Sequence, residues 1–170
     1  MTPDQETEAR PEKLDDTSNE IPESELQPAS PVQNETVTVS EQPCLLLVED
    51  NKINQKIAMS LVVKLGYQVD LAENGLEAIA AAGKRRYDLI LMDMQMPQMG
   101  GVEATRKIRA LGGPNSITPI IALTANAMES DYEACRAAGM NDFMTKPVNR
   151  DALIDCIARW STVTPSDSST

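Results

Sequence analysis

Histidine does not occur anywhere in this 170-residue sequence. Acid–base catalysis by histidine, metal binding by histidine and phosphorylation of histidine are therefore excluded within this chain. Aromatic residues make up only 3% of the sequence, so a core has to be built from aliphatic residues and methionine. Hydrophobic residues account for 41% in total, which is enough for the core of one domain.

Cysteine is also scarce, and Cys44, Cys135 and Cys156 form an odd set without paired spacing. This usage favours small buried thiols in a reducing compartment, so we expect a cytoplasmic location. The first residues do not have the pattern of a secretory signal. No apolar run approaches the roughly 18 residues that a bilayer crossing needs, so we expect no membrane span in this chain.

Basic residues are in the minority, and the acidic excess that gives a net charge of −11 is unevenly placed. Residues 1–43 carry 11 Asp and Glu against 2 Lys and Arg, whereas residues 44–170 carry 15 against 13. The second part has no basic excess for nucleic acid or an anionic membrane, so we expect no nucleic-acid partner. Because residues 1–43 also hold six of the eleven prolines, we predict a disordered acidic arm or linker over 1–42. We predict one folded domain over 43–161 and a polar disordered tail over 162–170.

Short apolar runs alternate with helical patterns from Cys44 onward. The runs predict five strands, at 44–48, 67–72, 87–92, 119–123 and 142–145. Helical spacing predicts a helix after each strand, at about 51–65, 74–82, 101–110, 126–138 and from 149 onward. This alternation is typical of an α/β fold in which helices cover both faces of a five-stranded parallel sheet.

Caps and apolar spacing give the predicted helices their ends and their inward faces. We expect N-caps at Asn51, Asn74, Asn126 and Asn149, and helix ends at Gly66 and Gly139. Glu77 and Glu129 stand three residues after two of these asparagines, as in a capping box. The apolar residues expected to face the core are Ile53, Ile57, Leu61 and Leu65 in the first helix, Val102 and Ile108 in the third, and Leu153, Ile154 and Ile157 in the last.

The stretch Leu89–Pro97 gives the clearest indication of a functional site. Four apolar residues run directly into Asp93, and a proline follows four residues later. Asp93 is therefore expected where a buried strand leaves the core. A carboxylate at such a point is costly unless a charged or hydrogen-bonding group meets it.

Polar side chains also stand where three other predicted strands end. Glu49 and Asp50 follow the first strand, Thr124 follows the fourth and Lys146 follows the fifth. Each alone is explained by a turn or an exposed charge. Because ligands of open parallel sheets bind outside the carboxyl ends of the strands, these groups are expected to meet Asp93 at one edge.

Three carboxylates at one edge repel one another, at a cost of roughly 4 kcal/mol for a pair 4 Å apart. They either take up protons or bind a cation, and an all-oxygen set suits Mg²⁺. A carboxylate beside Mg²⁺, a hydroxyl and a lysine is equipped to accept a phosphoryl group, which would form an aspartyl phosphate.

Four motifs together resemble the response-regulator receiver domain of two-component phosphorelay signalling. They are Val48-Glu49-Asp50-Asn51, Leu91–Pro97, Ala122-Leu123-Thr124-Ala125 and Thr145-Lys146-Pro147, and the resemblance covers about residues 43–160. The run from Glu49 to Gln55 is similar to receivers of hybrid sensor histidine kinases. The resemblance implies a flavodoxin-like doubly wound (βα)5 fold with strand order 2-1-3-4-5.

The resemblance also implies roles for individual residues. Asp93 would be the phosphoacceptor. The Mg²⁺ ligands would be Asp50 and Asp93 directly, Glu49 through water and the backbone carbonyl of Gln95. Lys146 would contact the phosphoryl group, with a cis peptide bond before Pro147.

Further implied roles concern the response to phosphorylation. Thr124 would turn to hydrogen-bond a phosphoryl oxygen, and Phe143 would change rotamer with it. Phe143 is otherwise explained as a core residue. Gln95 and Asn126 occupy positions that tune dephosphorylation in the family, although a helix cap also explains Asn126.

Partners follow from the same resemblance. A histidine phosphotransfer domain or a histidine kinase would dock near the first helix, at about Ile53 to Leu61. Dimerisation or effector binding would use the face of the fourth helix, fifth strand and fifth helix. We expect neither a kinase module nor an output domain in this chain, and no enzyme activity beyond its own phosphorylation and dephosphorylation.

Two other functions stay open. A degenerate receiver would act as a phosphorylation-independent interaction module, although the complete acidic set and Lys146 argue against it. A phosphatase that forms an aspartyl phosphate needs a second acid two residues after its nucleophile, where this chain has Gln95.

Overall fold

The computed structural model describes residues 42–126 and 128–161. The predicted arm up to residue 41 and the predicted tail over 162–170 lie outside the described residues.

Five strands alternate with five helices in the described part of the chain. The strands are β1 Cys44–Val48, β2 Gln68–Ala72, β3 Leu89–Asp93, β4 Ile120–Thr124 and β5 Asp142–Thr145. The helices are α1 Lys52–Lys64, α2 Gly75–Lys84, α3 Gly101–Ala110, α4 Glu129–Ala138 and α5 Arg150–Trp160, with a short 3₁₀ helix at Pro114–Ser116. None of the helices in these ranges combines the length and hydropathy that a bilayer crossing requires.

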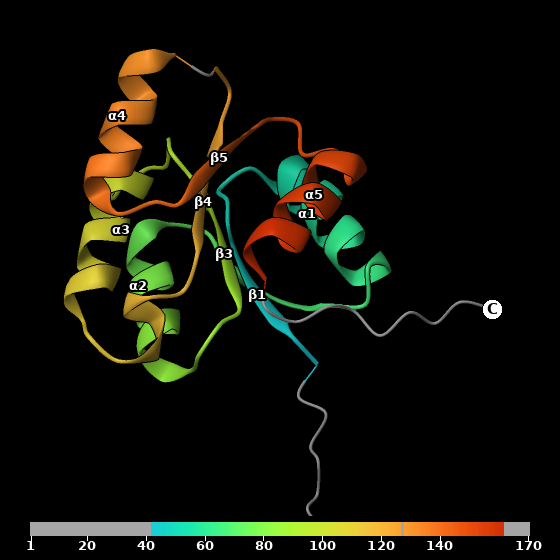
Figure 1. The fold of residues 1–170 in the computed structure, drawn as a ribbon, viewed down its shortest axis with the longest axis horizontal. Helices are drawn as coiled ribbons and strands as arrows, with labels where there is room; N and C mark the ends of the chain where they lie inside the picture. The colour runs from blue at the N-terminus through green and yellow to red at the C-terminus, as the bar shows by residue number, and fades with distance from the viewer. Residues whose placement is uncertain (1–41, 127, 162–170) are drawn as a thin grey trace, which may run out of the picture. The chain divides into compact units, whose positions relative to one another are not determined.

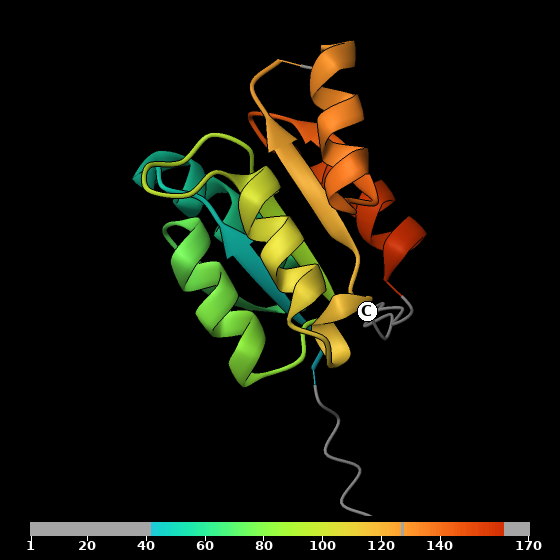
Figure 2. The same ribbon diagram turned by 90° about the vertical axis from the view of Figure 1, so that its left-hand side faces the viewer.

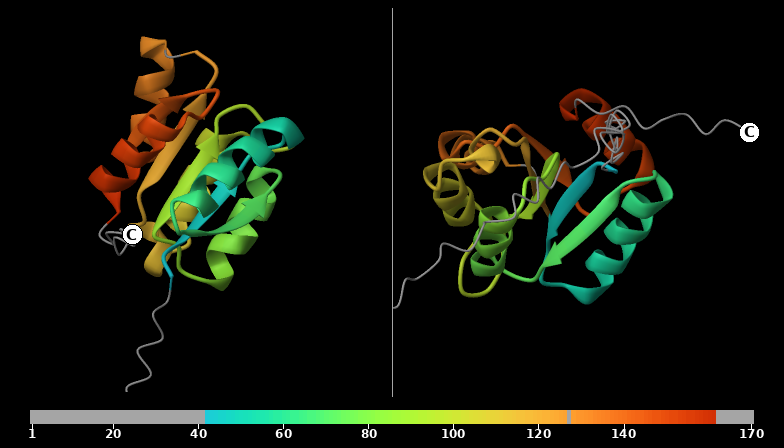
Figure 3. Two further views of the ribbon diagram at one scale, coloured as in Figure 1. Left: turned by 90° about the vertical axis from the view of Figure 1, so that its right-hand side faces the viewer. Right: turned by 90° about the horizontal axis from the view of Figure 1, so that it is seen from below.

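The strands form one parallel sheet in the order β2-β1-β3-β4-β5 (Figure 1). Helices α2, α3 and α4 lie side by side over one face, as Figure 2 shows. Helices α1 and α5 cover the other face, which Figure 3 shows from the opposite side. The predicted doubly wound fold and its strand order are confirmed.

The core consists of two layers, one on each face of the sheet. Leu46 and Val48 of β1 belong to the layer under α2, α3 and α4, whereas Leu45 and Leu47 belong to the layer under α1 and α5. Because successive strand residues point to opposite faces, a strand buried on both faces must be apolar throughout. The continuous apolar runs in the sequence are explained by this arrangement.

Three of the four predicted N-caps are confirmed. The side chains of Asn51, Asn74 and Asn149 accept hydrogen bonds from backbone amides in the first turns of α1, α2 and α5. The cap predicted at Asn126 is wrong, because α4 begins at Glu129 and its N-cap is Met128, which makes no side-chain cap. The backbone of Asn126 instead hydrogen-bonds the hydroxyl of Thr124.

The predicted inward face of α1 is also wrong at its start. Ile53 is 69% exposed and Ile57 is 40% exposed, whereas Gln55, Ala58 and Val62 are buried. The helix packs on the sheet through smaller residues and a polar one, so the spacing of its isoleucines marks an outer surface.

Smaller corrections apply to α3 and α5. Val102 and Ile154, both expected to face the core, are only partly buried. The buried residues are Gly101, Ala104, Thr105 and Ile108 in α3, and Leu153, Cys156 and Ile157 in α5. Ile108, Leu153 and Ile157 are buried as predicted. A search for large apolar residues overlooks the small buried ones, which are Gly101, Ala104 and Cys156.

Candidate functional site

Asp93 is the last residue of β3, and its side chain is only 1% exposed. Its Oδ1 accepts a hydrogen bond of 3.0 Å from the backbone amide of Gln95. Its Oδ2 lies 2.8 Å from Nζ of Lys146 as an ion pair and has no other hydrogen-bond partner among the described residues. The carboxylate is thus fixed on one side by the loop after β3 and faces a cation on the other.

Lys146 follows β5 and reaches across the sheet edge to two acids. Besides Asp93, its ammonium contacts Oε2 of Glu49 at 3.3 Å. Burial by itself would lower the pKa of Lys146, but the hydrogen bond and charge of Asp93, with those of Glu49, raise it above its usual value. The lysine is therefore held protonated, and its peptide bond to Pro147 is cis, as the resemblance implies.

Glu49 is also 1% exposed, and α1 supplies its other contacts. Its Oε1 accepts from the backbone amide of Asn51 at 3.2 Å and from Nδ2 of Asn54 at 3.1 Å. Burial raises the pKa of Glu49, and the charge of Asp93 adds to this, while Asn54 and Lys146 oppose it. Burying this carboxylate is therefore costly in the absence of a further positive charge.

The carboxylates of Glu49, Asp50 and Asp93 form a possible metal site. One oxygen from each lies within 4.8 Å of the others, and Asp50 is exposed at the rim. Oδ2 of Asp93, which faces the Lys146 ammonium at 2.8 Å, is a carboxylate oxygen that could also bind a cation. Hard oxygen donors with an open rim suit Mg²⁺, which keeps several waters, so these residues fit the predicted ion.

Thr124 lies at the end of β4, but its hydroxyl is engaged away from Asp93. It donates to the carbonyl oxygen of Asn126 at 2.7 Å and accepts from the amide of Asn126 at 3.2 Å. The backbone carbonyl of Thr124 accepts from the amide of Lys146 at 2.8 Å. The backbone of Thr124 thus connects β4 to Lys146, whereas the Thr124 hydroxyl would have to rotate to reach the Asp93 carboxylate.

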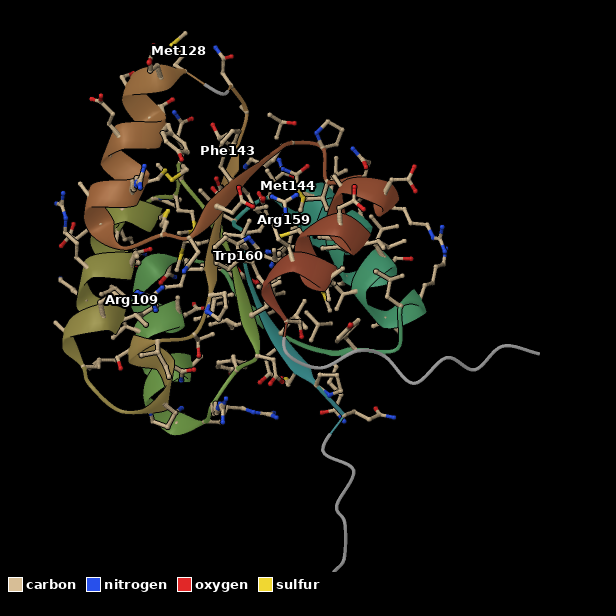
Figure 4. The ribbon with its side chains drawn as sticks, viewed as in Figure 1. Arg109, Met128, Phe143, Met144, Arg159 and Trp160 are labelled. Carbon is tan, nitrogen blue, oxygen red and sulfur yellow. The ribbon has the colours of Figure 1, made fainter. Side chains whose placement is uncertain are left out.

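Phe143 of β5 is 40% exposed, so its explanation as a core residue is wrong. Its ring meets the edge of Tyr132 from α4, with 5.5 Å between ring centroids. In Figure 4 Phe143 lies on the α4 side of β5. A cavity of about 270 Å³ lies among the side chains of this region, lined by Thr124, Met128, Glu129, Asp131, Tyr132, Cys135 and Phe143.

Sequence reasoning missed three contributors to the site. Asn54 and Gln55 hold Glu49 from α1, and Gly101 lets α3 begin against the carbonyl of Asp93. Gln55 gave little signal, because it stands two positions from both Ile53 and Ile57 and therefore off the helix face that was predicted to be buried. Gly101 gave no signal of its own, because the need for glycine there comes from its contact with the backbone of Asp93, which only the structure shows.

Comparison with known proteins places the chain in a family. The response regulator receiver domain family matches residues 45–158. The chain therefore belongs to this family, whose domains work in two-component and phosphorelay signalling.

Its relatives include hybrid histidine kinases. It is 46% identical over 126 residues to hybrid signal transduction histidine kinase B of Dictyostelium discoideum, and the match covers 68% of this chain and 6% of that protein. It is 37% identical over 151 residues to probable histidine kinase 1 of Oryza sativa subsp. indica, and that match covers 71% of this chain and 16% of the relative. The chain thus spans less than a fifth of the length of these relatives.

Two solved structures are similar in fold. The receiver domain of the sensor histidine kinase PA1611 from Pseudomonas aeruginosa PAO1, which has a magnesium ion in its active-site cleft, is 45% identical with a TM-score of 0.66, covering 70% of this chain and 97% of that one. The receiver domain of Ssk1 from Saccharomyces cerevisiae was crystallised with the histidine phosphotransfer protein Ypd1. It is 34% identical to this chain with a TM-score of 0.66, and the match covers 75% of this chain and 94% of that one.

Proposed function

We propose that this receiver domain accepts a phosphoryl group on Asp93 from a phosphohistidine donor and thereby changes a protein-binding surface. The supporting observation is the buried Asp93 carboxylate, which faces the Lys146 ammonium at 2.8 Å and shares an edge with Glu49 and Asp50. Similar receivers of known structure support the same assignment.

The three acids are the proposed magnesium site. Asp50 and Asp93 would bind the ion directly, Glu49 would act through water, and the backbone carbonyl of Gln95 would complete the protein ligands. When bound, Mg²⁺ would neutralise charge on the acids and on the phosphoryl oxygens.

In the proposed reaction, a carboxylate oxygen of Asp93 attacks phosphorus, and the bond from phosphorus to the donor's imidazole nitrogen breaks. The imidazole leaves with the electron pair of that bond and takes up a proton. Lys146 is placed to pair with the negative phosphoryl oxygens during the transfer. Water later cleaves the acyl phosphate, so the domain would act on no substrate besides itself.

Thr124 and Phe143 are the proposed switch. Turning the Thr124 hydroxyl toward the phosphoryl group would break its hydrogen bonds to Asn126. The cavity beside Phe143 gives that ring room to move. The surface of α4, β5 and α5 would then change, and a dimer partner or an effector would recognise it.

The donor is proposed to dock on α1. Ile53 and Ile57 are exposed on this helix beside the acidic site, and exposed apolar groups of this kind suit a protein partner. A histidine phosphotransfer domain or a histidine kinase in the cytoplasm would be the donor. The complex of the Ssk1 receiver with Ypd1 supports this choice.

Transfer from a radiolabelled phosphohistidine protein, such as phosphorylated Ypd1, tests the proposal. With Mg²⁺ the label should move to the wild-type chain, and chelation of the ion should prevent transfer. Asp93→Asn should accept no label, whereas the exposed-site control Asp155→Asn should accept it normally. Failure of the wild type to take label from any such donor would count against a phosphohistidine source.

A further inference from the structure

Glu49 is held in place by the first turns of α1 at two points. The side-chain amide of Asn54 donates to carboxylate Oε1 at 3.1 Å. The buried amide of Gln55 donates to the backbone carbonyl of Glu49 at 2.6 Å. One residue therefore fixes the backbone where β1 ends, and its neighbour fixes the direction of the carboxylate.

The two carboxylate oxygens of Glu49 have partners on opposite sides. Oε2 is attracted to Lys146 at 3.3 Å, whereas Oε1 is held by Asn54 and by the backbone amide of Asn51. Without Asn54, the 3.2 Å bond from Asn51 would be the remaining hydrogen bond on Oε1. The carboxylate would then be free to turn toward the lysine, whose charge is needed at Asp93.

Such a turn would also depend on the space beside the carboxylate. A small cavity of about 10 Å³ lies beside these groups, lined by Glu49, Asn54, Ile57, Ala58, Leu123, Lys146, Pro147 and Val148. This is close to the volume that one water molecule needs. Shortening the Asn54 side chain would enlarge the cavity and admit more water beside the carboxylate.

We infer that Asn54 is a positioning residue that sets the Mg²⁺ affinity of this domain by fixing the carboxylate of Glu49. The inference rests on the proposed function, because it concerns the same acidic site. Groups that orient direct metal ligands typically account for a 10–100-fold difference in affinity. Because Glu49 is proposed to act through water, we expect an effect near the lower end of that range. Asn54 itself is only partly buried, so its effect should fall on metal binding more than on folding.

Calorimetric titration with magnesium chloride tests the inference. Asn54→Leu keeps the branched shape of the side chain but cannot donate, and Asn54→Ala removes both the branch and the donor. Both should bind Mg²⁺ about tenfold more weakly than the wild type. Ser60→Ala, at an exposed position on the same helix, is the matched control and should bind as the wild type does.

Urea unfolding of the metal-free proteins separates positioning from folding. A purely structural role would lower the stability of both Asn54 variants and leave their Mg²⁺ affinity unchanged, and that result would overturn the inference. Wild-type affinity in both variants at unchanged stability would overturn it as well. A wild-type chain that binds no Mg²⁺ would instead contradict the proposed metal site, and the inference would fall with it.

Discussion

Nζ of Lys146 lies 2.8 Å from Oδ2 of Asp93, and the same ammonium lies 3.3 Å from Oε2 of Glu49. One positive charge thus joins the ends of β1, β3 and β5. With Asp50 also at this edge, three carboxylates share one lysine. The site is short of positive charge, and this shortage underlies its expected response to cations.

Mg²⁺ should stabilise the folded protein, because an ion that binds only the native state raises its stability by linkage. At 100 times the dissociation constant the gain is about 2.7 kcal/mol. Thermal melting with Mg²⁺ and with excess chelator measures it. Asp50→Asn should lose most of the gain, and an equal gain in this variant would contradict the assignment of Asp50 as a ligand.

Gly101→Ala should destabilise the fold by about 2 kcal/mol or more. A Cβ at this position would lie 2.3 Å from the backbone oxygen of Asp93, so α3 would have to move away from the site. Gly83→Ala is the control, since no described residue lies within 4 Å of a Cβ there and alanine favours the α2 helix by about 0.5–1 kcal/mol. Urea unfolding should therefore give shifts of opposite sign, and equal shifts would contradict the contact.

Arg109→Lys should cost about 2–3 kcal/mol, although the charge is kept. The guanidinium donates to backbone carbonyls on two loops, those of Asn115, Ser116, Thr118 and Gly139, and to the side chain of Asn141. An ammonium cannot satisfy so many acceptors in this geometry. Arg106→Lys, at an exposed position of α3, should be neutral in the same unfolding assay. A similar small effect at both sites would show that the loop contacts contribute little.

Burial raises the pKa of the Cys156 thiol to about 12, and the charge of Asp142 adds to the rise. The folded protein therefore keeps the thiol proton at a pH where the unfolded chain, with a value of 9.0, releases it. This contribution to stability is complete below pH 9 and is lost as the pH rises toward 12. The wild type should lose stability relative to Cys156→Ala over this range, and parallel pH profiles would contradict the raised pKa.

Local rules predicted much of the fold because they depend on neighbouring residues. The caps at Asn51, Asn74 and Asn149 need only the next turn of helix, and the buried strands need only their composition. The cap at Asn126 failed because α4 begins only at Glu129, and the backbone of Asn126 instead hydrogen-bonds the hydroxyl of Thr124. Hydrophobic spacing also fails to distinguish a helix face that packs on the sheet from one that is exposed, as at Ile53.

The candidate site was predictable at the strand ends but not beyond them. Topology alone brings Glu49, Asp50, Asp93 and Lys146 to one edge, since the carboxyl ends of parallel strands coincide. The contacts of Asn54 depend on how α1 is rotated against the sheet. That rotation is a property of packing, which a one-dimensional pattern does not encode.

The most direct test is the intact mass of the protein after incubation with a small phosphodonor such as acetyl phosphate and Mg²⁺. The wild type should gain the mass of one phosphoryl group, stable in acid and lost in base, and Asp155→Asn should behave in the same way. Asp93→Asn should gain nothing. An undiminished gain in Asp93→Asn would contradict the assignment of Asp93 as the phosphoacceptor.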